Sequence, residues 1–275
     1  MAQYICSTCG TQFAESAAPP PRCPICEDER QFVGWQGQAW TTLEELRTRH
    51  RVSLQREAPG LEGIGIEPRF AIGQRALLVR TGGGNVLWDC IPLVDEPVVE
   101  AIRALGGLKA IAVSHPHYYG GVIEWSRALG GEGGAEVPVY LHAADQRWIM
   151  RPDPSIRLWD GETMSLGPGL TLVRCGGHFE GATVLHWAGG AEGRGCLLAG
   201  DVVQVAEDRR HVSFMYSYPN YIPLGPRAVR RIVGALEPFR YDQIFGAWWG
   251  RNILAGGEQV VARSAARYLA HVGED

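Results

Sequence analysis

A four-layer α/β fold, in which two β-sheets pack face to face and helices cover both outer faces, is what the sequence predicts. Strand-like segments come first, mixed strands and helices follow, and this order then repeats along the chain. Three apolar strands also end in residues of metal-ligand type, at the edge where open α/β sheets place their sites. We assign residues 60–275 to this αββα sandwich, residues 1–34 to a small cysteine-rich unit and residues 35–59 to a linker helix.

The composition sets broad limits on what the chain does. Its 275 residues, 45% hydrophobic and 20% charged, are enough for one large domain and an appendage. A net charge of −4 gives no general attraction to nucleic acid or anionic membranes. No apolar run approaches the ~20 residues that span a bilayer, and the first residues lack the pattern of a signal peptide. We therefore expect a cytoplasmic protein with no membrane partner.

Four of the seven cysteines lie in the first 26 residues, as two Cys-x-x-Cys pairs. Cys6 with Cys9, and Cys23 with Cys26, can wrap their sulfur atoms around one tetrahedral zinc ion, and Gly10 suits the turn after the first pair. Two disulfides or a redox pair are the alternatives, which a cytosolic location and the absence of a βαβ pattern disfavour. We predict a zinc ribbon, or rubredoxin-like knuckle, in which the metal supplies most of the folding energy.

The charge of this ribbon bears on its partners. Residues 1–34 carry four acidic and two basic side chains, a net charge of −2 (4 − 2), which disfavours binding to phosphate groups. Contact with protein, including a second copy of this chain, is the better expectation for its surface. The linker that follows begins with a capping-box-like Thr-x-x-Glu, which predicts a short helix over residues 41–50.

From residue 63 the pattern changes to strands, with a Gly-rich hairpin turn at residues 81–84. Helices are expected at residues 96–105, 119–129, 227–236 and 257–271. Strands are expected at residues 64–66, 75–80, 85–90, 109–113, 137–142, 157–161, 170–173 and 183–187.

The strand at residues 109–113 runs directly into Ser-His-Pro-His. His115 and His117 can aim both imidazoles into one cleft, and Pro116 stiffens the link between them. Neutral imidazole is a common zinc ligand, so the pair is a candidate half of a metal site. The alternative is two loop histidines that cap the strand. Two later apolar strands end in the same manner, one reaching His178 through two glycines and one ending at Asp201.

The order of these motifs resembles the metallo-β-lactamase-fold hydrolases over about residues 60–255. It runs from the His-x-His motif to Gly-Gly-His-Phe-Glu-Gly-Ala-Thr and then to Leu-Ala-Gly-Asp. Two departures stand out. The first motif of that family usually continues to Asp and His, where this chain has Tyr119 and Gly120, and the late histidine of the family is missing from residues 244–252.

The missing side chains belong largely to the second metal of two-metal members. The resemblance therefore implies one metal ion, zinc in preference to iron or manganese, held by His115, His117, His178 and Asp201. It also implies that Asp89 supports the site from behind. Aromatic and polar residues near the motifs are pocket candidates, with core packing as the alternative. These candidates are Tyr119, Tyr216, Tyr218, Asn220 and Trp248.

The resemblance, with these ligand residues, implies a hydrolase that uses one metal-bound water or hydroxide. Its substrate would be a small-molecule ester, thioester, lactone or phosphoester, and Asp201 is a ligand or orients the water as a base. A non-catalytic metal-binding or scaffold protein with a degenerate site is the alternative from another class. A nuclease is disfavoured by the acidic ribbon and by the lack of Lys and Arg clusters near the motifs.

Overall fold

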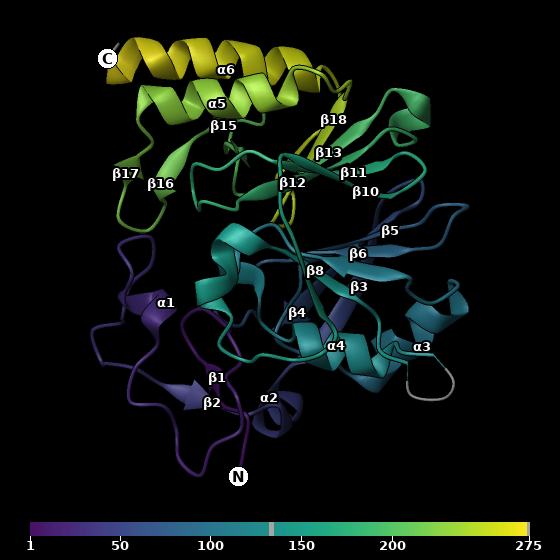
Figure 1. The fold of residues 1–275 in the computed structure, drawn as a ribbon, viewed down its shortest axis with the longest axis vertical. Coiled ribbons are helices and arrows are strands. Elements are labelled where there is room, and N and C mark those ends of the chain that lie inside the picture. Colours follow the sequence, from purple (N-terminus) through teal and green to yellow (C-terminus); the bar gives the residue numbers. More distant parts are fainter. Residues whose placement is uncertain (132–134, 274–275) are drawn as a thin grey trace. The chain divides into compact units, whose positions relative to one another are not determined.

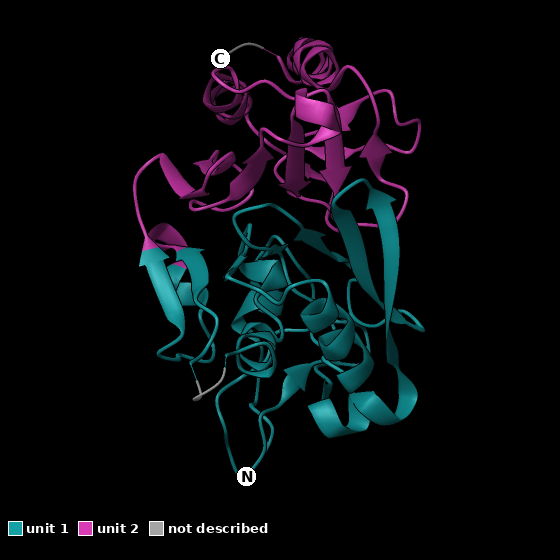
Figure 2. Cartoon of the chain, turned by 90° about the vertical axis from the view of Figure 1, so that its right-hand side faces the viewer, with its two compact units in different colours: residues 1–141, 146–158 teal, residues 142–145, 159–275 magenta. Residues whose placement is uncertain are grey.

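Strands and helices alternate along the chain in a computed structural model that describes residues 1–131 and 135–273 (Figure 1). The chain divides into two units (Figure 2). Unit 1 comprises Met1–Leu141 and Gln146–Leu158, and unit 2 comprises His142–Asp145 and Trp159–Asp275. The predicted boundaries of ribbon, linker and main domain stay a prediction.

The N-terminal cysteines belong to a small substructure of unit 1. Strand β1 (Ile5–Cys6) pairs antiparallel with β2 (Trp40–Thr41), and helix α1 (Pro24–Glu27) contains Cys26, with Cys23 as its N-cap. Helix α2 (Leu43–Arg49) then begins at a capping box, in which the Thr42 side chain and the Glu45 side chain each accept the other residue's backbone N–H at 3.2 Å. The predicted capped helix is confirmed.

The large sheet of unit 1 has seven strands in the order β3-β4-β5-β6-β7-β8-β9. Their bounds are Arg51–Ala58, Leu61–Glu67, Ala76–Val79, Val86–Trp88, Ala110–Ala112, Val139–His142 and Ile156–Trp159. The pairs from β3 to β6 are antiparallel, whereas β6, β7 and β8 run parallel. Residues 51–58 fall in the segment expected to be a linker, and instead they form the edge strand β3.

Two helices and one short turn complete the connections of unit 1. Helix α3 (Glu96–Ala104) is capped by the Asp95 side chain, which accepts the Val98 N–H at 3.2 Å. A 3₁₀ turn (Pro116–Tyr118) follows β7 and precedes α4 (Val122–Ala128). The expected helix over residues 119–129 therefore starts three residues late, because Gly121 adopts a φ of +73°.

The sheet of unit 2 has six strands in the order β10-β11-β12-β13-β18-β19. Their bounds are Thr163–Gly167, Leu170–Arg174, Thr183–Trp187, Cys196–Gly200, Gln243–Gly246 and Asn252–Ile253. Only β13 and β18 pair in parallel. Two short hairpins follow β13, made of β14 (Gln204–Val205), β15 (Val212–Ser213), β16 (Met215–Ser217) and β17 (Ile222–Pro223).

Helices α5 (Pro226–Leu236) and α6 (Gly257–Val272) lie side by side in unit 2 (Figure 1). The remaining 3₁₀ segments are Ala143–Trp148 and Ala191–Gly193. Each large sheet is lined by buried aliphatic side chains, such as Leu77, Leu87 and Ile111 in unit 1 and Leu185 and Leu197 in unit 2. Within residues 1–131 and 135–273, no helix is long and apolar enough to cross a membrane.

Candidate metal centres

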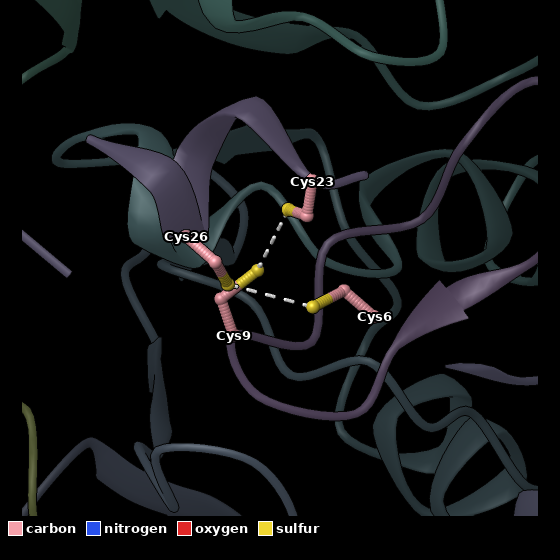
Figure 3. A group of neighbouring side chains, drawn as sticks. All are labelled: Cys6, Cys9, Cys23 and Cys26. Atoms are coloured by element: carbon pink, nitrogen blue, oxygen red, sulfur yellow. Dashed lines mark hydrogen bonds between the residues drawn. The ribbon is translucent and has the colours of Figure 1, made fainter. Parts of the chain in front are cut away.

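The four N-terminal cysteines bring their sulfur atoms to one point (Figure 3). All four Sγ atoms lie within 4.8 Å of one another, with Cys6 to Cys26 at 3.5 Å and Cys9 to Cys23 at 3.8 Å. A disulfide needs about 2.05 Å, so the cysteines are unbonded thiols. Zinc–sulfur distances of about 2.3 Å place tetrahedral sulfurs ~3.8 Å apart, and the observed spacings fit that geometry. The donor set suits a structural zinc ion.

Local backbone turns explain this convergence. Gly10, with a φ of +82°, donates its N–H to the Cys6 carbonyl at 2.8 Å, and Cys26 donates to the Cys23 carbonyl at 3.0 Å. Each Cys-x-x-Cys is thus a tight turn that presents two sulfurs on one side. Hydrogen bonds among the four thiols, those of Cys23 first, lower the pKa of Cys6 and raise the pKa of Cys9 and Cys26, so without a metal the cluster favours a thiolate at Cys6.

One polar partner of this knuckle was missed by the sequence analysis. The Gln38 side-chain amide donates to the Cys6 sulfur at 3.1 Å. Such a hydrogen bond stabilises a thiolate and orients it, as outer partners of metal ligands do. Gln38 lies twelve residues beyond Cys26 in an irregular segment, and no sequence pattern points to it.

His115 and His117 lie together in unit 1, just past the end of β7. Their side chains are 1% and 3% exposed, and their ring centroids are 5.2 Å apart at an interplanar angle of 74°. His115 is the N-cap of the 3₁₀ turn, in extended conformation, and its Nδ1 lies 2.9 Å from the Ser114 hydroxyl. The short strand and the turn hold both imidazoles at one strand end.

Asp89 fixes the backbone just ahead of this pair. Its carboxylate accepts the Ser114 N–H at 2.7 Å, and its own N–H donates to the Ala112 carbonyl at 2.9 Å. Asp89 is buried at the end of β6, next to β7, and adopts a φ of +60°. Aspartate is one of the few side chains that tolerate this left-handed conformation. The predicted role of Asp89 in support of a metal site stays a prediction.

His178 and Asp201 lie in unit 2. After β11, Gly176 and Gly177 adopt φ values of +70° and +86° and turn the chain toward His178. The Nδ1 of His178 lies 3.2 Å from the Met215 carbonyl. A carbonyl only accepts, so Nδ1 carries the hydrogen and the lone pair of the neutral ring is on Nε2.

Tyr218 connects the elements around these two residues. Its hydroxyl donates to the backbone carbonyl of Asp201 at 3.0 Å, and its ring centroid is 5.8 Å from that of His178. Burial, and next the negative charge of Asp201, raise the pKa of the Tyr218 phenol well above its ordinary value. Tyr218 therefore stays a protonated donor at neutral pH.

The other pocket candidates differ in exposure. Tyr119 is buried, Tyr216 and Trp248 are half-buried, and Asn220 is exposed with its N–H donating to the Ser217 hydroxyl at 3.2 Å. Their roles in substrate binding stay a prediction.

His142, at the end of β8, is a contrasting histidine. Its Nδ1 accepts the Ala144 N–H at 3.1 Å, and its Nε2 donates to the Gly161 carbonyl at 3.1 Å. Burial lowers the pKa of His142 and so favours its neutral form. Hydrogen bonds within the protein occupy both nitrogens of this neutral ring.

Comparisons with known proteins decide the family. Solved structures with the same fold include VMB-1, with a TM-score of 0.57 and 14% identity over 81% of this chain and 99% of that one. The DIM-1 metallo-β-lactamase gives a TM-score of 0.58 with 14% identity, covering 80% of this chain and 98% of its own. FIM-1 from Pseudomonas aeruginosa, in its mono-zinc form, gives 0.55 with 18% identity, covering 78% and 95%.

A much closer sequence relative is the uncharacterized protein YmaE of Bacillus subtilis strain 168. It is 46% identical over 271 residues, which cover 98% of this chain and 96% of YmaE. The chain belongs to the YmaE family of metallo-β-lactamase-fold proteins. No protein-family model matches this YmaE-family chain. Its predicted fold class, a metallo-β-lactamase-type α/β sandwich preceded by a four-cysteine knuckle, is confirmed.

Proposed function

We propose that this YmaE-family protein is a metal-dependent hydrolase that holds one metal ion with His115, His117, His178 and Asp201. The proposal is carried by one observation, which is that each unit has two buried side chains of metal-ligand type near its strand ends. Unit 1 places His115 and His117 just past the carboxyl end of β7, and unit 2 places His178 and Asp201 just past the carboxyl ends of β11 and β13. This is the order of the resembled fold. In the proposal, the two pairs share one ion.

The donor set fits zinc. Three neutral imidazoles and one carboxylate supply four ligands and leave a Zn²⁺ site with a net charge near +1. The hydrogen bond to Met215 already selects the His178 tautomer that ligates through Nε2. Iron or manganese would need added waters at the same ligands. When bound, the metal acidifies a water molecule and polarises the scissile carbonyl or phosphoryl group.

The side chains of the protein have separate tasks in this scheme. Asp89 holds the N–H of Ser114 and so fixes the direction of the histidine pair. Tyr218 anchors the backbone of Asp201, whose carboxylate ligates or orients the water. We propose no second metal, because Gly120 has no side chain and tyrosine, the residue at position 119, is a poor metal ligand in its protonated form.

The proposed substrates are small molecules with an ester, thioester, lactone or phosphoester bond. Tyr216, Asn220 and Trp248 are the proposed contacts that select among them. A four-thiolate zinc site also favours the reducing cytoplasm as the compartment of the protein.

The proposal is tested by measuring metal content and hydrolysis on the same purified sample, with one chromogenic substrate for each bond type. The wild-type protein should hold two metal ions per chain and hydrolyse at least one substrate. His178→Ala should retain the ribbon metal, lose the other ion and lose hydrolysis. His271→Ala, an exposed histidine on α6, is the matched control and should change neither. Wild-type protein with one metal per chain and no hydrolysis would instead indicate a non-catalytic scaffold.

A further inference from the structure

The four-cysteine knuckle lies directly against the loop that carries His115 and His117. A Cβ built on Gly120 would lie 2.4 Å from the backbone oxygen of Gly10 and 3.0 Å from its carbonyl carbon. Gly120 has no left-handed φ, so space alone requires glycine there. Gly10 directly follows Cys9, and Gly120 lies three residues after His117. The knuckle and the loop that carries the histidine pair are thus connected through one backbone contact within unit 1.

A buried arginine makes a second connection between the knuckle and the same region. Arg151 donates through Nη1 to the side-chain oxygens of Gln12, at 2.5 Å, and of Glu124, at 2.6 Å. Gln12 belongs to the knuckle, and Glu124 lies in the first turn of α4, directly after the histidine loop. Arg151 and Gln12 are both buried, so water competes little for these bonds.

Close packing fills the space between these two connections. Thr11 and Gln12 line a cavity of about 10 Å³ together with Tyr119, Val122 and Ile123. That volume holds at most about one water molecule, so the two surfaces have little room to move independently. Thr11 is itself tied to the cysteines, because its hydroxyl accepts from the Cys9 sulfur at 3.3 Å and its carbonyl accepts the Cys6 N–H at 2.9 Å.

We infer that the knuckle is a positioning element for the histidine loop. With metal on the four cysteines, residues 10–12 are rigid and hold residues 115–121 in the arrangement that presents both imidazoles. Loss of that metal frees residues 10–12, and the loop then opens more often. The consequence for catalysis rests on the proposed function, whereas the contact itself does not. Contact of the ribbon with another protein stays a separate prediction.

Hydrogen exchange measures this coupling without any metal at the histidines. The N–H groups of Tyr118 and Tyr119 are hydrogen-bonded to the carbonyls of His115 and Pro116, so they report opening of the loop. In full-length protein stripped of main-site metal, Cys26→Ser should lose the ribbon zinc and raise exchange at these two amides at least tenfold. The amides of α5 in unit 2 should be unchanged. Unchanged exchange at Tyr118 and Tyr119 would overturn the inference.

A second variant leaves all four cysteines intact. Gly120→Ala places a methyl group against the Gly10 carbonyl and should raise exchange at the same amides while the ribbon zinc stays bound. Gly34→Ala and Gly82→Ala are matched controls, because neither glycine has a left-handed φ or any atom within 4 Å of an added Cβ. Both controls should behave as wild type. If Cys26→Ser unfolds unit 1 as a whole, Gly120→Ala decides the question.

The double variant shows whether the knuckle carries the effect. Once Cys26→Ser has released residues 10–12, Gly120→Ala has nothing rigid to collide with and should add less than twofold to exchange. Fully multiplicative effects would mean that the added methyl group acts on the loop directly, which overturns the inference. A wild-type protein that never binds main-site metal contradicts the proposed function alone, and the exchange results still decide the role of the knuckle.

Discussion

The two candidate metal centres are built in opposite ways. The four cysteines come from 21 consecutive residues, Cys6 to Cys26, and converge through two tight turns. The histidines and the aspartate come from three strand ends spread over 87 residues, His115 to Asp201, in two units. A local site of this kind folds with its metal, whereas a distributed site depends on sheets that must form first. Loss of metal at the first site should therefore unfold the N-terminal segment and loosen the loop packed against it, whereas changes at the second site should mainly weaken metal binding.

The largest expected effect is at the knuckle. Cys6→Ser removes one of four thiolates and the acceptor of the Gln38 amide, so the ribbon zinc should be lost. Structural zinc contributes about 10 kcal/mol or more of folding free energy in small zinc domains, and residues 1–34 should unfold without it. Proteolysis with mass analysis should show new cleavage mainly in the N-terminal segment. Cys90→Ser, at a buried cysteine outside the cluster, is the control and should keep the zinc. If the Cys6→Ser protein keeps its zinc and a folded N-terminal segment, the cysteine site does not depend on its metal for folding, and the contrast between the two centres is wrong.

A smaller effect is expected behind the histidine pair. Asp89→Ala removes the acceptor of the buried Ser114 N–H and places alanine at a φ of +60°. The variant should lose about 2–4 kcal/mol of unfolding free energy. Main-site metal affinity should fall about 10–100-fold, as for other residues that orient metal ligands. Asp89→Asn keeps an acceptor and tolerates the same φ, so this variant should retain most of the unfolding free energy and most of the metal affinity. Equal losses of stability and metal affinity in the two variants would mean that Asp89 acts through its negative charge and not through the hydrogen bond to Ser114.

The smallest effect is expected at Tyr218. Tyr218→Phe removes the hydrogen bond to the Asp201 carbonyl and should lower the unfolding free energy by about 1 kcal/mol. The folded-state pKa of Tyr218 is raised. The contribution of its phenol to the unfolding free energy is therefore fully present below the unfolded-state pKa of about 10 and is lost as the pH rises beyond that value. Wild type and variant should therefore differ by a constant amount between pH 6 and 9 in urea titrations. A difference that changes within this range would show that the phenol titrates there.

Sequence analysis predicted the features that leave a local or periodic signal. Cysteine spacing predicted the knuckle, and the apolar strands with their terminal ligands predicted the fold class. Strand β3 was missed because none of its residues is buried and because three polar side chains in a row, Gln55 to Glu57, interrupt the apolar pattern. The start of α4 was misplaced because the 3₁₀ turn and Gly121 interrupt it.

The contacts between knuckle and loop could not be predicted from the sequence. Gln12, Arg151 and Glu124 are far apart in the chain, and a polar contact of this kind follows no period. Gly120 looked like a missing ligand in a degenerate motif. The structure gives it a packing reason, because any side chain there would collide with Gly10.

The claim that one ion is shared by His115, His117, His178 and Asp201 is tested most directly by anomalous diffraction at the zinc absorption edge. The account predicts one peak at the four sulfurs and a single second peak with three nitrogens and one carboxylate oxygen at about 2.0–2.2 Å. Two peaks about 3.5–4 Å apart near the histidines, or no peak there in zinc-saturated crystals, would contradict it.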